Sequence, residues 1–93
     1  MALNFEWDKK KAAENRRKHS VSFEEAATVF ADPLSITIPD PLHSHQENRF
    51  VIIGQSTKHV LLVVIHTDRK GTVRIISARR ATSYERKNYE ENN

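Results

Sequence analysis

The fold is decided by residues 49–80, RFVIIGQSTKHVLLVVIHTDRKGTVRIISARR. Three runs rich in Val, Ile and Leu, at residues 49–55, 59–67 and 72–79, have the composition of β-strands. The connections at 56–58 and 68–71 are too short for a parallel crossover, so these strands must pair as antiparallel hairpins. This stretch therefore predicts an antiparallel β-meander.

The flanking sequence adds a fourth strand and three helices. Residues 34–38 have strand composition and lie between prolines. Asp8 and Ser22 are suitable N-cap residues for helices that end near His19 and Asp32, and Thr82 with Glu85 forms a capping box for a helix to about residue 90. A chain of 93 residues is expected to hold one core. We expect a single α+β domain, 1–93, with two N-terminal helices packed on the antiparallel meander and a C-terminal helix.

The composition excludes several classes of protein. The chain has no cysteine, which excludes disulfides, thiolate zinc sites and a cysteine nucleophile. The longest apolar run, residues 60–65, is far shorter than the roughly 20 residues of a membrane-spanning helix. Only two glycines are present, and no phosphate-binding loop motif occurs. We therefore expect a soluble, cytoplasmic protein without a cofactor.

Charge is distributed in blocks along the chain. Residues 1–19 and 49–93 are basic, whereas residues 20–48 contain five carboxylates and no Lys or Arg. This arrangement predicts a basic side for a polyanion and an acidic side for a basic partner segment, with a merely solvated surface as the alternative. Lys9, Lys10 and Lys11 fill the first turn of the first helix, where cations are unfavourable, so this turn is either a phosphate site or a set of lysines pointing into water.

Three arginines lie on or at the end of the last predicted strand. Arg74, Arg79 and Arg80 would project from a rigid frame, and guanidinium can bind two phosphate oxygens at once. Strict alternation places Arg74 and Arg80 on the face opposite Val73, unless a β-bulge intervenes. The alternative interpretation is that these arginines only pair with nearby carboxylates, such as Glu85.

Histidine could provide the proton transfers that metal-free cleavage of RNA requires, because its pKa lies near neutrality. His19 and His66 lie at the ends of predicted elements that could converge on the sheet. His43 and His45 form an H-x-H pair with carboxylates nearby, but this pair lies in a predicted loop without cysteine, so we expect no metal site.

The sequence resembles the BrnT family of toxins from bacterial type II toxin–antitoxin systems, almost from end to end. The resemblance rests on Phe5-Glu6-Trp7-Asp8, Lys11, Asn15, Lys18-His19, Val21-Ser22-Phe23-Glu24-Glu25-Ala26, Val29-Phe30-Ala31-Asp32-Pro33, His43-Ser44, Arg49-Phe50, Gly54, Leu61-Leu62-Val63-Val64, Thr67, Arg74-Ile75-Ile76-Ser77-Ala78-Arg79-Arg80-Ala81, Glu85-Arg86 and Tyr89. One departure is visible, because Ser20 stands where the family usually has glycine after Lys-His.

The resemblance implies a RelE-like ribonuclease that cleaves RNA, arrests translation and is neutralised by a DNA-binding, BrnA-like antitoxin, which we expect to form a heterotetramer with it. Our hypothesis is a metal-independent endoribonuclease; a non-catalytic nucleic-acid-binding module and a regulatory interaction module are the alternatives. The predicted catalytic residues are His19, Arg74, Arg79 and Arg80, with His19 as the acid or base. The predicted RNA-binding residues are Lys11, Lys18 and Arg49.

Overall fold

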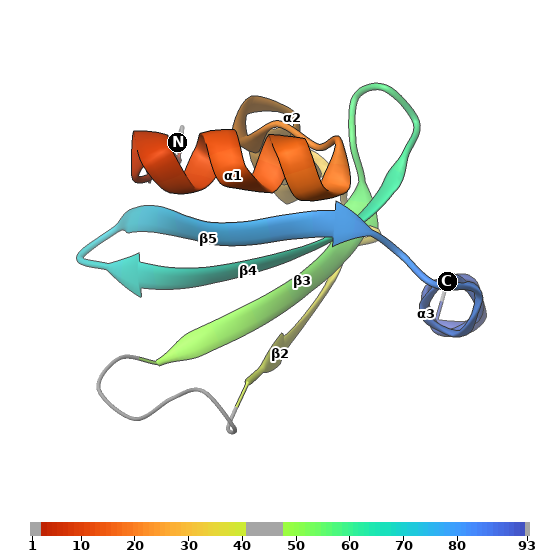
Figure 1. Ribbon diagram of the computed structural model, residues 1–93. Helices are drawn as coiled ribbons and strands as arrows, with labels where there is room; N and C mark the ends of the chain where they lie inside the picture. Colours follow the sequence, from red (N-terminus) through yellow and green to blue (C-terminus); the bar gives the residue numbers. More distant parts are fainter. Residues whose placement is uncertain (1–2, 41–47, 93) are drawn as a thin grey trace.

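The computed structural model describes residues 3–40 and 48–92. It contains a five-stranded sheet in the order β1-β5-β4-β3-β2 (Figure 1). The strands are β1 Asn4–Glu6, β2 Ile36–Pro39, β3 Arg49–Gln55, β4 Leu61–Arg69 and β5 Thr72–Arg80. The helices are α1 Lys9–His19, α2 Phe23–Thr28, the short 3₁₀ helix η1 Val29–Ala31 and α3 Ser83–Glu91.

The predicted meander is present, but the sheet is not purely antiparallel. Strands β2 to β5 pair in sequence as antiparallel neighbours. The segment expected only as an extended start forms β1, which pairs parallel to β5. The meander leaves one edge of β5 open, and β1 pairs with this edge. Phe5 of β1 packs edge to face on Phe30, with ring centroids 5.2 Å apart. The sheet is therefore mixed.

A β-bulge in β5 changes which arginines share a face. Ile65 pairs with Ser77, and the next residue, His66, pairs with Ile75, so Ile76 is the extra residue. Because Arg74 pairs with Thr67 and Arg79 pairs with Val63, these two arginines lie on the same face. Arg80 pairs with Leu62 on the other face. The expectation that Arg74 and Arg80 share a face is therefore wrong.

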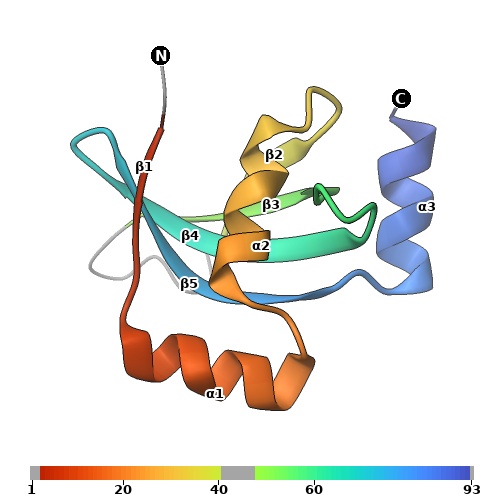
Figure 2. The same cartoon turned by 90° about the horizontal axis from the view of Figure 1, so that it is seen from above.

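Helix α2 covers one face of the sheet, and α1 runs along the edge of β5 (Figures 1 and 2). The core lies beneath α2 and contains the buried residues Val21, Phe23, Ala26, Val29, Ile52, Leu62, Val64, Val73, Ile75 and Ala78. The backbone of β3 approaches η1 so closely that a Cβ atom at Gly54 would lie 2.7 Å from Cγ1 of Val29. Within the described residues, no helix is long and apolar enough to cross a membrane.

The helix caps follow the predicted pattern. Asp8 accepts hydrogen bonds from the backbone N–H groups of Lys10 and Lys11, at 2.8 and 3.1 Å. Thr82 and Glu85 form the predicted capping box of α3. Ser22 caps α2, but the Glu25 carboxylate accepts a hydrogen bond from Ser56 across the fold, at 2.8 Å.

Asn15 is a buried amide in the middle of α1, and it bonds to the edge of β5. Its Nδ2 donates to the carbonyl of Ala78 at 2.8 Å, and its Oδ1 accepts from the N–H of Ala78 at 3.0 Å. Nδ2 also donates to the carbonyl of Val21 at 3.0 Å. The side chain therefore takes the place that a neighbouring strand would have beyond the end of β1.

Replacing Asn15 with leucine should lower the free energy of unfolding by about 3 kcal/mol or more, since leucine leaves the two backbone groups of Ala78 buried and unpaired. Urea denaturation of the purified protein would measure this change. Arg17→Ala, on the exposed side of the same helix, is the matched control and should change stability by less than about 0.5 kcal/mol. Equal effects of the two substitutions would contradict the role of Asn15.

Ser20 ends α1 in the left-handed conformation, with φ of 58° and its N–H bonded to the carbonyl of Arg16. A side chain is disfavoured there, so Ser20→Gly should raise the free energy of unfolding by about 0.5–1 kcal/mol. Ser20→Ala keeps a Cβ atom and should give no such gain. Thermal melts of the three proteins test this, and an alanine variant as stable as the glycine variant would refute the strain.

Candidate functional site

The seven predicted site residues fall into three groups in the structure. Lys11, Lys18 and His19 line a groove between α1 and β5. Arg49 and Arg74 lie on the sheet face opposite the core, on either side of Thr67. Arg79 and Arg80 lie at the end of β5, next to α3.

The groove between α1 and β5 has a volume of about 250 Å³ and a lining of mixed polar and apolar surface. Lys11, Lys18 and His19 lie on one side of α1, because residues separated by seven or eight positions return to the same face of a helix. The bulge residue Ile76 and its neighbour Ser77 line the opposite wall. Asn15 holds the two walls together through its bonds to Ala78. The groove thus combines two cations with an imidazole and a hydroxyl group.

Glu14 also lines this groove, and sequence reasoning did not single it out. It lies three residues after Lys11 and four before Lys18, which is the spacing of ordinary surface pairs on a helix. The signal that could have identified it is this i−3 and i+4 spacing, which places it between the two lysines on the groove face.

Arg74 lies on the sheet face opposite the core and does not line the groove. Its Nη1 donates to Oε2 of Glu6 on β1 at 2.7 Å. Because Glu6 lies two residues before Asp8, the N-cap of α1, Arg74 lies near the start of this helix, which is the end that carries Lys11. The pKa of Asp8 is lowered, first by the backbone hydrogen bonds from Lys11 and Lys10. The amides of the first turn of α1 are bound by Asp8, so this turn does not present them to an external phosphate.

Arg79 forms a bidentate ion pair with Glu85 of α3. Its two terminal nitrogens donate to the two carboxylate oxygens at 2.7 and 2.8 Å. The hydrogen bonds from Arg79 lower the pKa of Glu85 to about 2, against the opposing effect of burial. Arg79 therefore pairs with Glu85 and Arg74 pairs with Glu6, as the alternative interpretation of the arginines stated. Arg80 is exposed. The catalytic roles of the three arginines stay predictions.

His66 does not join His19 in the groove. It lies buried on the core face of β4, in edge-to-face contact with Phe30 and stacked on Phe50. Burial lowers its pKa, and Nδ1 has no hydrogen-bond partner. His43 and His45 lie outside the described residues. In the parts of the chain that the structure describes, no group of three His, Asp or Glu side chains is arranged to hold a metal ion.

Two carboxylates of the acidic block, Asp32 and Glu25, are bound within the fold. Asp32 accepts hydrogen bonds from the N–H groups of Leu34 and Gln55 and from the hydroxyl of Tyr89. Burial alone would raise the pKa of Asp32, but these hydrogen bonds lower it. Burial and the bond to Asp32 raise the pKa of Tyr89 to about 12. Because Glu25 is also bound, to Ser56, these two carboxylates help to join α2, β3 and α3. The acidic side expected from the charge pattern stays a prediction.

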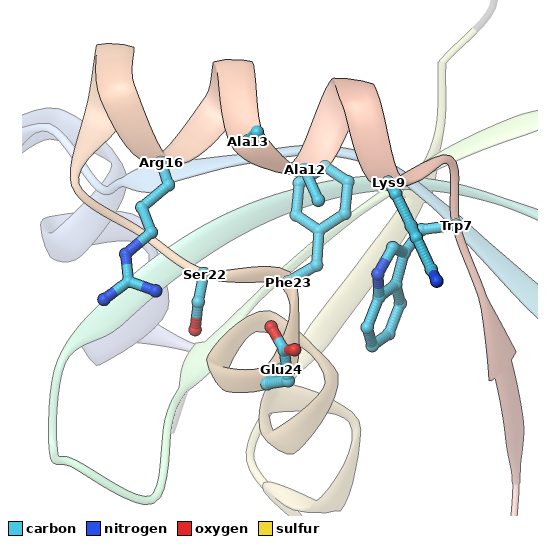
Figure 3. Close-up of a pocket in the computed structure, with 8 residues that line it drawn as sticks. All are labelled: Trp7, Lys9, Ala12, Ala13, Arg16, Ser22, Phe23 and Glu24. Atoms are coloured by element: carbon cyan, nitrogen blue, oxygen red, sulfur yellow. The ribbon is translucent and has the colours of Figure 1, made fainter.

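A larger groove, of about 490 Å³, lies on the other side of α1 (Figure 3). The indole of Trp7, which packs edge to face on Phe23, forms part of its wall, and Lys9, Arg16 and Glu24 lie around it. None of the seven predicted residues lines this groove.

The fold and the α1–β5 groove define a small α+β protein with basic and titratable side chains along one edge of its sheet, a class suited to binding or cleaving a polyanion. Comparison with family models narrows this class. The model described as "Ribonuclease toxin, BrnT, of type II toxin-antitoxin system" matches residues 7–85. The chain therefore belongs to the BrnT family of ribonuclease toxins.

The fold is also that of a solved member of this family. The crystal structure of the Brucella abortus ribonuclease toxin BrnT matches with a TM-score of 0.69 and 20% sequence identity, covering 88% of this chain and 100% of the other. No protein with a curated description matches the chain significantly. The resemblance recognised from the sequence is thus confirmed at the level of family and fold, and the relation to RelE stays a prediction.

The Arg79–Glu85 pair should make stability depend on pH. The pKa of Glu85 is lower in the folded protein than its ordinary value of 4.5, so the pair stabilises the fold above pH 4.5 and loses its effect as the pH falls towards 2. Glu85→Gln should therefore be less stable than the natural protein at pH 7, with a difference that shrinks between pH 4.5 and 2. Urea denaturation at several pH values measures this, with the exposed Glu90→Gln as the control. A difference independent of pH would contradict the assignment.

Proposed function

We propose that this chain is an endoribonuclease that cleaves RNA without a metal ion and thereby inhibits translation in the cytoplasm. The observation that carries the proposal is the α1–β5 groove, which brings Lys11, Lys18 and His19 together with Glu14 and Ser77. Membership of a ribonuclease toxin family supports it.

The groove offers the chemical groups that such a reaction needs. A base removes the proton of the ribose 2′-hydroxyl, the 2′-oxygen attacks the adjacent phosphorus, and an acid protonates the departing 5′-oxygen. His19 is the proposed acid or base. Lys11 and Lys18 lie about two helical turns apart and would bind the backbone phosphates on either side of the reacting one.

The arginines would supply further positive charge near the phosphate. Arg74 lies near the start of α1, which carries Lys11, and Arg80 is exposed at the end of β5. Arg79 already binds two carboxylate oxygens in the geometry that guanidinium uses for phosphate, so it would bind RNA by exchanging Glu85 for a phosphate group. Arg49 would bind the RNA backbone from the face opposite the core.

The family implies a protein antitoxin, because type II systems pair a protein toxin with a protein antitoxin. We propose that this partner is a BrnA-like, DNA-binding protein and that the two form a heterotetramer. The toxin would then be inactive while bound and would cleave RNA when released.

His19→Gln should reduce the rate of RNA cleavage by about 10²- to 10⁴-fold, because it removes a proton carrier and leaves the groove otherwise intact. The measurement is the cleavage of purified RNA in excess chelator, with identification of the product ends. Ends carrying 2′,3′-cyclic phosphate or 3′-phosphate are expected.

Lys18→Gln tests the RNA-binding role, and Arg17→Gln is its matched control. The two cations are neighbours in the sequence, but only Lys18 lines the groove. Lys18→Gln should weaken RNA binding more than Arg17→Gln. RNA bound by the natural protein but left uncut would favour the non-catalytic module, and cleavage only with added metal would overturn metal independence.

A further inference from the structure

The sheet face opposite α2 carries a continuous band of aliphatic side chains. The strand register places Ile38, Val51 and Ile65 in one row across β2, β3 and β4. Ile36, Ile53 and Val63 form the next row on the same face. We call the five residues Ile36, Ile38, Val51, Ile53 and Ile65 the open face, because Val63 is buried whereas these five are not.

Ile38 shows the exposure of the open face most directly, with 52% of its surface accessible. Helix α2 lies on the other side of the sheet, α1 lies along the β5 edge, and α3 lies beyond the end of β5, where Arg79 binds Glu85 (Figures 1 and 2). Among the described residues, the helices contact β3 and β5, and none packs extensively on β2 or β4. An exposed aliphatic surface of this kind on a small protein marks an interaction site.

The side chains around the open face are cationic. Arg49 and Arg74 occupy the adjacent row, on either side of Thr67, and Arg79 ends the row of Val63. Arg74 and Arg79 each bind one carboxylate of this chain, Glu6 and Glu85. The surface is therefore aliphatic at its centre and basic at its rim.

Three kinds of occupant can be compared with this chemistry. Single-stranded RNA would contact Arg49 at the rim, but its bases stack on aromatic rings, whereas the centre of this face is aliphatic and Phe50 lies on the core side against His66. A second copy of the chain would present the same face, whose rim arginines would find only the Glu6 and Glu85 carboxylates that each copy already uses. An amphipathic segment with aliphatic residues on one side and carboxylates at its edges matches both features.

We propose that the open face is the docking surface for the antitoxin, and that the docking segment of the antitoxin is acidic and amphipathic. The proposal deepens the proposed function by naming the chemistry of the partner, and it rests on the family's toxin–antitoxin pairing. Carboxylates of this segment would exchange with Glu6 and Glu85 on Arg74 and Arg79. These arginines lie four β4 positions apart, about 13 Å, which equals the rise of about nine residues of an α-helix.

The test compares two residues of equal exposure, Ile38 on the open face and Leu34 in the turn before β2, at 52% and 51%. The purified cognate antitoxin is titrated into each purified toxin variant in a calorimeter. Ile38→Glu should weaken antitoxin binding at least 10-fold, because it removes an aliphatic contact and adds repulsion. Ile38→Lys should weaken it less, and Leu34→Glu should change it less than 2-fold.

Circular dichroism and thermal melts establish that each variant is folded before titration. Equal affinities of the Ile38 and Leu34 variants would overturn the docking surface. A weaker complex for Ile38→Lys than for Ile38→Glu would overturn the acidic character of the segment. Self-association of the natural chain that Ile38→Glu abolishes, with antitoxin affinity unchanged, would assign the face to a second copy instead.

The affinity measurements do not depend on catalysis, so the two proposals can fail separately. Loss of antitoxin binding by Ile38→Glu in a protein that cuts no RNA would support the docking surface and refute the ribonuclease. RNA cleavage by all variants, with unchanged antitoxin affinity, would support the ribonuclease and refute the docking surface.

Discussion

The carboxamide of Asn15 is the contact on which the arrangement of this protein depends. Strand β1 pairs with β5 only as far as Arg74, so the edge of β5 beyond this point needs another partner for its backbone groups. One side chain supplies it, by donating to and accepting from Ala78. The same amide binds the carbonyl of Val21 and so fixes the connection to α2. The position of α1, and with it the groove that contains Lys18 and His19, follows from these three bonds.

The parts of the fold that were predictable depend on residues close together in the sequence. The caps at Asp8, Ser22 and Thr82 and the short connections of the meander are such features. Parallel pairing of β1 with β5 joins residues 68 positions apart, and no local pattern specifies it. The bulge at Ile76 was equally hidden, because Ile75 and Ile76 are both aliphatic and fit either face. Shifting the register there moved Arg80 away from the face of Arg74.

The sequence predicted several residues of the candidate site, but it did not predict which charged side chains pair with each other. The family pattern named Lys11, Lys18 and His19, and the structure brings them to one groove. Arg79 was equally prominent in the sequence, yet it is engaged by Glu85. Asp32 counted as surface charge, although it is bound by two backbone amides and a tyrosine. Charge counted along a chain does not reveal which groups are already paired, because pairing depends on contacts made after folding.

Arg74 gives the two surfaces of this protein a physical connection. It faces the same side of the sheet as the open face, and its charge also reaches Asp8 at the start of α1, beside Lys11. A carboxylate that took the place of Glu6 would keep Arg74 on the open face, and because Glu6 stays in the chain it would add one negative charge near the start of α1. An acidic partner on the open face would thereby weaken the attraction of the groove for phosphate without covering it. Because coulombic attraction extends beyond direct contact and is screened by salt, such inhibition would be strongest at low ionic strength.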